Sequence, residues 1–381
     1  MSAPTLADLT TLRVGGPVAQ FVRSQSESEF IEAVAQADAT GLPLLVIGGG
    51  SNLLASDAPF EGVVVSHGVA AITQHPAPAV GAGPLPDGEG APVSSDTSGD
   101  EDEAVRVIAS AGTTWDELVA WTVDRGLSGL EALSGIPGTV GAAPVQNIGA
   151  YGHEVAEFLE SIRAWDRQEH REVTLTREQM AFGYRTSVIK RSILESGWGP
   201  TGRWVVLEVT FRLRRSHLSA PILYSQLASS LDVEQGDVVA SRRVREAVLS
   251  LRASKGMVLT PGDHDTWSAG SFFTNPIIPS SAASVIDEDA PRYPAGEAAD
   301  GTPLVKTSAA WLIEHAGFTK GFALPGEGRA ALSSRHVLAL TNRGGATARE
   351  IADLARAIQR GVEDTFGIHL VPEPVCLGID L

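Results

Sequence analysis

Apolar residues recur at helical spacing in several parts of this chain. The two clearest stretches cover residues 26–41 and 347–366, and in each a Ser or Thr followed three residues later by Glu predicts a capping box. Shorter stretches of the same kind predict three further helices, over residues 114–123, 241–253 and 308–316. The first of these three is also expected to begin with a capping box, formed by Thr114 and Glu117.

Short apolar runs between the helical stretches predict strands. These runs cover residues 44–47, 63–65, 105–111, 162–165 and 204–207. Helix and strand alternate over residues 26–65, so this part is expected to form a small α/β unit. Residues 154–214 are expected to form short strands and turns, and a last strand-like segment carries Glu373.

Two polar stretches interrupt this pattern. Residues 71–105 contain five prolines, five glycines and seven acidic residues, but no lysine or arginine. Such a stretch cannot bury enough apolar surface to offset the entropy lost on ordering. We therefore expect a surface excursion at about residues 74–104, inside a domain, and a second, Pro/Ser-rich insertion at about residues 279–302.

The bulk composition predicts a globular protein and excludes several functions. The 381 residues suffice for two or three domains, and there is neither a membrane-spanning apolar run nor a secretory signal, so a cytoplasmic protein without membrane contact is expected. A net charge of -17 argues against nucleic-acid binding. The single cysteine, Cys376, cannot form an internal disulfide, and no cluster has metal-ligand spacing, so no metal is expected.

A first glycine loop, residues 48–52, directly follows the predicted strand 44–47. Backbone N–H groups in such loops often face a phosphate. The sequence lacks the Gly-Lys-Ser/Thr of a P-loop, and Leu53 stands where a dinucleotide fingerprint has its third glycine. On this motif alone, an ordinary tight turn remains an alternative.

A second glycine loop, residues 134–152, reads "SGIPGTVGAAPVQNIGAYG". Its glycines allow a ligand to approach the backbone, its two prolines stiffen it, and its other side chains include neutral hydrogen-bonding groups such as Gln146 and Asn147. A glycine-rich hairpin connector is the alternative, but it predicts alternating apolar flanks, which are absent. Two such loops in one α/β region favour a dinucleotide lying between them.

Seven stretches in this order resemble the UDP-N-acetylenolpyruvoylglucosamine reductases, flavoenzymes of peptidoglycan precursor synthesis. They read "TLRVGGPVAQF", "VIGGGSNLLASD", "SGIPGTVGAAPVQNIGAYGHEV", "FGYRTSVIK", "AGSFFTNP", "KTSAAWLIEHAGFTKG" and "VPEPV". The resemblance implies an α+β fold, with a vanillyl-alcohol-oxidase-type FAD-binding domain of two α/β subdomains and a third α+β substrate-binding domain. The expected bounds are 1–69 and 70–256 for the subdomains, 257–366 for the third domain and 367–381 for a C-terminal segment.

The resemblance implies FAD as cofactor and NADPH as hydride donor for reduction of the enolpyruvyl ether of the UDP-sugar. Relatives in the wider superfamily that bind the flavin covalently do so through His or Cys. Neither glycine loop contains either residue, so non-covalent FAD is expected. The implied FAD contacts lie on the two loops: Gly48, Gly49, Gly50, Ser51, Asn52, Gly135, Ile136, Pro137, Gly138, Gly141, Ala142, Ala143, Pro144, Asn147, Ile148, Gly149 and Ala150.

Three residues match the catalytic residues of the family. Arg185 would grip the substrate carboxylate, because a guanidinium is permanently charged and can donate two parallel hydrogen bonds. Glu373 would donate a hydrogen bond in its protonated form, if its surroundings raise its pKa. Ser271 would deliver the proton. Taken singly, these residues are typical of a surface salt bridge, a strand-end glutamate and a turn serine.

Four further residues resemble substrate contacts. Tyr184 precedes the arginine, and Tyr224 matches the tyrosine that one subgroup of the family places over the UDP-sugar. Lys255 and Asn275 match polar groups near the diphosphate and the sugar, with Lys255 in the looser local match. The alternatives are an oxidase of the wider superfamily and a catalytically silent flavin- or nucleotide-sugar-binding protein. A monomer is expected, and the sequence does not decide between NADPH and NADH.

Overall fold

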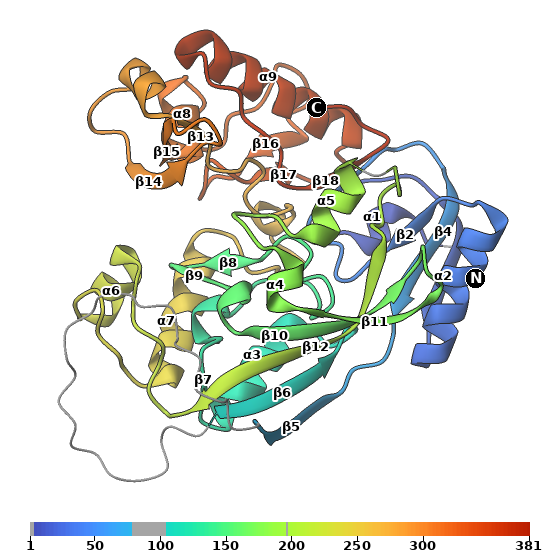
Figure 1. The fold of residues 1–381 in the computed structure, drawn as a ribbon. Helices are drawn as coiled ribbons and strands as arrows, with labels where there is room; N and C mark the ends of the chain where they lie inside the picture. The colour runs from blue at the N-terminus through green and yellow to red at the C-terminus, as the bar shows by residue number, and fades with distance from the viewer. Residues whose placement is uncertain (1–3, 78–103, 196) are drawn as a thin grey trace, which may run out of the picture.

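The computed structural model describes residues 4–77, 104–195 and 197–381 (Figure 1). In the described part, no helix is both long and apolar enough to cross a membrane, and no group of His, Cys, Asp and Glu could hold a metal ion. The described residues form three sheets of three or more strands, with helices packed against them.

The first sheet is parallel and has the strand order β1-β4-β2. Its strands and helices are α1 (Leu6–Leu9), β1 (Val18–Ser24), α2 (Glu27–Thr40), β2 (Leu44–Val46) and β4 (Phe60–His67). The expected helix at residues 26–41 and both strands after it are confirmed. Ser26 caps α2, but Glu29 bonds the backbone N–H of Gln25, so the reciprocal half of the predicted capping box is wrong.

The second sheet is antiparallel, in the order β11-β10-β12-β6-β5, and β7 pairs with β12. Its strands are β5 (Ile72–Pro76), β6 (Ala104–Ser110), β7 (Leu127–Ser128), β10 (Leu159–Asp166), β11 (Arg171–Thr176) and β12 (Trp204–Arg215). Helix α3 (Trp115–Asp124) packs against it through Trp115, Leu118 and Val119, which are fully or almost fully buried. Helices α4 (Arg177–Met180), α5 (Val188–Glu195), α6 (Ser225–Leu231) and α7 (Ser241–Ser254) complete this region.

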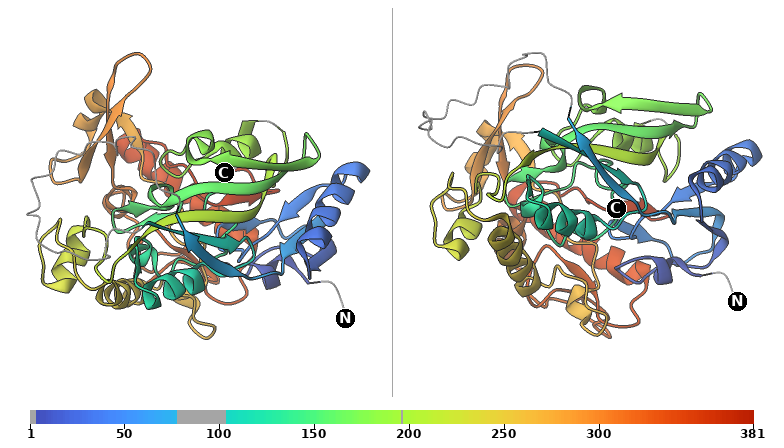
Figure 2. Two further views of the ribbon diagram at one scale, coloured as in Figure 1. Left: turned by 60° about the horizontal axis from the view of Figure 1, so that its bottom comes forward. Right: turned by 90° about the horizontal axis from the view of Figure 1, so that it is seen from below.

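The third sheet has the order β13-β15-β14, and its β14–β15 hairpin projects from the body of the molecule (Figure 2). The elements beyond residue 276 are β13 (Ile277–Pro279), β14 (Arg292–Glu297), β15 (Pro303–Thr307), α8 (Ala309–His315), β16 (Ala330–Leu332), β17 (Leu340–Asn342), α9 (Ala348–Phe366) and β18 (Val375–Leu377). Helix α9 begins with the predicted Thr347–Glu350 capping box and ends at Gly367.

The C-terminal region returns to the first part of the chain. Strand β18 pairs in parallel with β3 (Leu53–Ala55), and Leu12, Val14 and Leu54 pack in the same core as α8 and α9. Residue 52 is therefore held next to residue 373, although they are separated by 321 positions. The strand begins at Val375, so Glu373 lies just before the expected last strand rather than in it.

Four expectations from the sequence need correction. The first residues of the expected 74–104 excursion belong to β5, and residues 78–103 lie outside the described part of the chain. The insertion expected at 279–302 is a 3₁₀ helix (Ser280–Val285) followed by β14, because a partly exposed edge strand tolerates polar residues. Thr114 does not cap α3 and instead bridges to Thr139. Residues 154–214 include helices α4 and α5 as well as strands.

Candidate active site

The first glycine loop runs from β2 to β3 in close contact with backbone on two sides. A Cβ atom at Gly49 would lie 2.8 Å from the Cα of Gly138, and one at Gly50 would lie 2.0 Å from the carbonyl oxygen of Leu9. Gly50 also has φ +60, a conformation that favours glycine. The loop therefore needs glycine in order to pack, in addition to any ligand it holds.

The second glycine loop lies directly against the first. Ser51 Oγ donates to the carbonyl oxygen of Pro137 over 3.0 Å, and a Cβ at Gly48 would meet Thr139 Oγ1 at 2.4 Å. The end of this loop and the two residues after it form a hairpin of β8 (Gly149–Ala150) and β9 (His153–Glu154). The connector alternative thus describes the end of the segment, whereas residues 137–139 face the first loop.

A cavity of about 380 Å³, here called the central cavity, lies between the two loops. This volume is within the range of roughly 300–1,000 Å³ typical of small-molecule sites. Twelve of the expected cofactor contacts line it: Gly48, Gly49, Gly50, Ser51, Asn52, Ile136, Pro137, Gly141, Ala142, Ala143, Ile148 and Gly149. The other five do not line it, namely Gly135, Gly138, Pro144, Asn147 and Ala150.

Two side chains that line the central cavity carry a nitrogen without a partner. Arg252 is 9% exposed, and its Nε makes no hydrogen bond within the described part of the chain; the same is true of Nε2 of His67. A buried donor without an acceptor is costly, so a ligand with acceptor oxygens would satisfy Arg252. The glycine backbone on the walls and this arginine both fit a large, polar, anionic ligand such as FAD.

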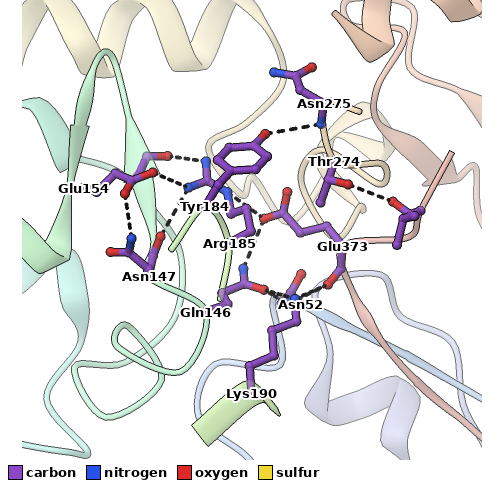
Figure 3. A network of polar contacts seen from close by, with 12 residues as sticks. Asn52, Gln146, Asn147, Glu154, Tyr184, Arg185, Lys190, Thr274, Asn275 and Glu373 are labelled. Atoms are coloured by element: carbon purple, nitrogen blue, oxygen red, sulfur yellow. Dashed lines mark hydrogen bonds and ion pairs between the residues drawn. The ribbon is translucent and has the colours of Figure 1, made fainter. Parts of the chain in front are cut away.

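The side chains of Arg185 and Glu373 are in contact in the central cavity (Figure 3). Arg185 Nε lies 3.3 Å from Glu373 Oε1, and the two side chains are 19% and 14% exposed. Arg185 also donates to the carbonyl oxygens of Asn147, over 3.2 Å, and Gly149, over 2.9 Å. These bonds from the second glycine loop fix the plane of the guanidinium.

Glu373 is held by residues from the two loops and from α5. Gln146 Nε2 donates to its Oε1 over 3.2 Å, and Lys190 Nζ donates to its backbone carbonyl, also over 3.2 Å. Burial raises the pKa of Glu373 and outweighs the opposing charges of Arg185 and Lys190. Burial likewise lowers the pKa of Lys190, against the effect of Glu373. The pKa of Glu373 is thus shifted in the direction that favours a protonated carboxyl group.

Ser271 lines the central cavity. Its segment of the chain pairs with the segment that carries Glu373. The backbone N–H of Glu373 donates to the carbonyl oxygen of Phe272 over 2.8 Å, and Phe273 bridges to Pro372. Ser271 is half-buried, and within the described residues its hydroxyl makes no hydrogen bond. The hydroxyl is therefore free to contact a molecule in the cavity.

Tyr184 and Asn275 lie beside this group and line the central cavity. The hydroxyl oxygen of Tyr184 accepts a hydrogen bond from the backbone N–H of Asn275 over 3.2 Å, and Lys306 Nζ stands 4.7 Å from the centre of the tyrosine ring. Asn275 Oδ1 accepts from the backbone N–H of Ala309, at the start of α8. The side chain of Asn275 thus helps to fix the third domain.

Tyr224 and Lys255 do not line the central cavity. Tyr224 precedes α6 and is 42% exposed, with its ring 5.7 Å from that of Tyr151. Lys255 ends α7, and its Nζ donates to Gln226 Oε1 over 2.6 Å. The two residues are therefore near each other, on the side of the second glycine loop where the hairpin lies.

Four side chains of the site were not expected there as contacts of Glu373 or of the cavity, although Gln146 had been named as a hydrogen-bonding group of the second glycine loop. Lys190 and Gln146 hold Glu373, Glu154 bonds Asn147 Nδ2 over 2.6 Å, and Arg252 lines the central cavity. Lys190 lies five residues after Arg185 in the stretch "FGYRTSVIK". Its place in this motif was the available sign that it belongs to the same site as Arg185. Arg252 follows Val244 and Val248 at four-residue spacing, so its place on the apolar face of the same helix was the available signal.

Two family models match the chain. One describes the C-terminal domain of UDP-N-acetylenolpyruvoylglucosamine reductase and matches residues 261–377; the other describes an FAD binding domain and matches residues 18–75 and 96–173. The second match and the fit of the central cavity agree on FAD as the cofactor.

Proteins similar over their whole length carry the same description. A UDP-N-acetylenolpyruvoylglucosamine reductase of Nocardia farcinica is 48% identical over 100% of this chain and 90% of its own length. Another, of Thermobifida fusca, is 47% identical over 99% of this chain and 97% of its own length.

The solved structure of a UDP-N-acetylenolpyruvylglucosamine reductase from Thermus caldophilus has the same fold. It covers 98% of this chain and 97% of its own, with a TM-score of 0.59 and 24% sequence identity. The expected fold, an FAD-binding domain followed by a substrate-binding domain, is thereby confirmed. The chain belongs to the UDP-N-acetylenolpyruvoylglucosamine reductase family.

Proposed function

We propose that this protein reduces the enolpyruvyl ether of UDP-N-acetylenolpyruvoylglucosamine to UDP-N-acetylmuramate, with NADPH as the electron source, in peptidoglycan precursor synthesis. The single observation that carries the proposal is the Arg185–Glu373 pair beside Ser271 in a cavity lined by both glycine loops. FAD held between the two glycine loops would supply hydride transfer from NADPH to the methylene carbon of the enolpyruvyl group. The side chains of the protein must then stabilise the negative charge that develops on the substrate and donate a proton to the neighbouring carbon.

Arg185 and Glu373 are proposed to stabilise the charge that develops on the substrate. Hydride addition leaves an electron pair on the neighbouring carbon, which delocalises into the adjoining carboxylate. Arg185 can donate two N–H bonds to that carboxylate, and protonated Glu373 can donate an O–H bond. The raised pKa of Glu373 supports this role, because an ionised carboxylate would repel the developing charge.

Ser271 is proposed as the proton donor. A serine hydroxyl is a very weak acid, so it donates only to a strongly basic centre such as the carbon formed by hydride addition. Its hydroxyl lines the central cavity and has no competing hydrogen bond in the described residues. NADPH and a proton from solvent balance the reaction, which yields NADP⁺ and the saturated lactyl ether.

Tyr184, Asn275, Tyr224 and Lys255 are proposed to contact the UDP-sugar. Tyr184 and Asn275 line the cavity at the third domain, and Tyr224 with Lys255 lies at the neighbouring hairpin. The position of Tyr224 on an exposed loop supports membership of the subgroup with a substrate-covering tyrosine. We keep a monomer as a prediction for the oligomeric state.

Stopped-flow measurement of each half-reaction tests the function. NADPH is expected to bleach the flavin absorbance under anaerobic conditions, and UDP-N-acetylenolpyruvoylglucosamine is expected to restore it. If oxygen restores the absorbance but the UDP-sugar does not, the protein is an oxidase of the wider superfamily. If NADPH does not bleach the flavin, a silent binding protein is the better description.

Substitution of Gly49 by Ala is expected to lower the affinity for FAD. The new Cβ would lie 2.8 Å from the Cα of Gly138, so one glycine loop must shift, at a cost of about 1–3 kcal/mol that corresponds to roughly 5- to 150-fold in Kd. Flavin released on heat denaturation, measured against protein, reports the bound FAD. Gly262→Ala is the matched control, because a Cβ there has no neighbour within 4 Å. Flavin retained by the precipitated chain would instead indicate covalent attachment and contradict the expected non-covalent binding.

A further inference from the structure

His153 connects the second glycine loop to the loop that carries Tyr224. It is the first residue of β9, directly after a turn in which Tyr151 and Gly152 have φ +51 and +93. The imidazole is 5% exposed. Its Nε2 lies 2.9 Å from the carbonyl oxygen of Pro221, and its Nδ1 lies 2.7 Å from Glu157 Oε2.

Both partners of this imidazole are acceptors. A backbone carbonyl can only accept, and a carboxylate can only accept, so both ring nitrogens must carry protons for the two bonds to form together. Burial by itself lowers the pKa of His153, but the bonds to Glu157 and Pro221 and the charges of Glu157 and Glu131 raise it above the ordinary 6.5. The geometry therefore fits the imidazolium form.

A second buried side chain holds the neighbouring residue of the same loop. Glu131 is 1% exposed, and its carboxyl group accepts from the backbone N–H groups of Gly129 and Ala220. Ala220 and Pro221 are adjacent, so one loop segment is held through an N–H by Glu131 and through a carbonyl by His153. Glu131 and Glu157 are the charged groups that face the imidazole.

The held segment leads directly to Tyr224. Leu223 packs on the hairpin turn so closely that a Cβ at Gly152 would lie 2.6 Å from its Cβ, and Tyr224 meets Tyr151 edge to face at 5.7 Å. The same hairpin holds Arg185 through the carbonyl of Gly149. The position of Tyr224 relative to the catalytic arginine is thus set through this hairpin.

We propose that protonated His153 is a positioning residue for the UDP-sugar: it holds the loop of residues 219–224 on the hairpin and so fixes Tyr224 for substrate binding. The proposal rests on the proposed function of this site. The bonds that His153 makes as an imidazolium are present at low pH and are lost as the pH rises through its raised pKa. KM for the UDP-sugar is therefore expected to increase above pH 6.5 through an inflection that kcat does not share.

The test is the KM for UDP-N-acetylenolpyruvoylglucosamine between pH 6 and pH 9 in three variants. His153→Gln is expected to raise KM about tenfold at pH 6, the effect of one lost charge-assisted hydrogen bond, and to abolish the inflection. Glu157→Gln removes the charge but keeps an acceptor, so the inflection is expected to move to lower pH. The control is His75→Gln, on an exposed position of β5, which should leave the profile unchanged.

The outcomes separate this proposal from the proposed function. If the wild-type protein reduces the UDP-sugar but its inflection persists in folded, flavin-containing His153→Gln, the positioning role is wrong. The same holds if Glu157→Gln leaves the inflection in place, a measurement that remains decisive should His153→Gln not fold. If the wild-type flavin is bleached by NADPH and not restored by the UDP-sugar, the proposed function fails and the positioning role with it.

Discussion

Ser271→Ala is expected to leave reduction of the flavin by NADPH nearly intact and to slow its reoxidation by the UDP-sugar by roughly 10²–10⁴-fold, the usual contribution of a positioned general acid. The hydroxyl lines the central cavity, but it makes no bond that supports the fold in the described residues. Anaerobic stopped-flow absorbance of the two half-reactions measures both rates on one sample.

Two further variants make the Ser271 result specific. Ser271→Cys keeps an acidic proton at the same place and should recover part of the lost rate. Ser281→Ala removes an exposed hydroxyl from the same domain and should change neither rate. Equal losses in both half-reactions of Ser271→Ala would mean that this residue positions the flavin and does not donate the proton.

The second large effect is expected at Glu373, where alanine and glutamine should differ. Glu373→Ala removes the proposed hydrogen-bond donor and leaves Arg185 and Gln146 without their partner, so kcat should fall by about 10²–10³-fold. Glu373→Gln keeps a neutral donor of the same shape and should retain much more activity. Steady-state kcat of both variants provides the comparison.

The pH dependence at Glu373 has a definite sign. Its pKa is raised, so the protonated form persists above the ordinary 4.5, and the activity that depends on this form is lost as the pH rises through the raised value. In Glu373→Gln this loss should disappear. If Gln is as damaging as Ala at every pH, Glu373 acts as a carboxylate and the proposed hydrogen-bond donation is wrong.

Local signals in the sequence predicted the helices that carry their own start and stop residues. Thr347, Glu350 and Gly367 define α9 because capping depends on residues within one turn. Helix α6, with the sequence SQLASSL, has no capping side chain, and its packing against α7 decides its conformation. The Thr114 prediction failed because a distant residue, Thr139, pairs with its backbone.

The residues of the candidate site that lie in a recognisable motif could be predicted from the sequence. The residues that reach the site only through the packing of distant helices could not. The two loops and the residues Arg185, Ser271 and Glu373 stand in recognisable stretches, and the structure brings all of them to the central cavity. Lys190 and Arg252 reach the same cavity from α5 and α7, whose placement depends on the packing of the whole second region. Periodicity places Arg252 on the apolar face of α7 with Val244 and Val248, but it does not show which part of the protein that face meets.

The pairing of β18 with β3 has a consequence for how the protein acquires its structure. Asn52 Nδ2 donates to the carbonyl of Glu373, and the N–H of Val375 donates to the carbonyl of Asn52, across 321 and 323 positions of chain. Contacts of such separation form slowly, because a long loop must close before they stabilise anything. During synthesis on the ribosome, β3 is left with an unpaired edge until residues 375–377 emerge. The first glycine loop and β3 therefore reach their final contacts only after a segment 321 positions further along the chain has been made.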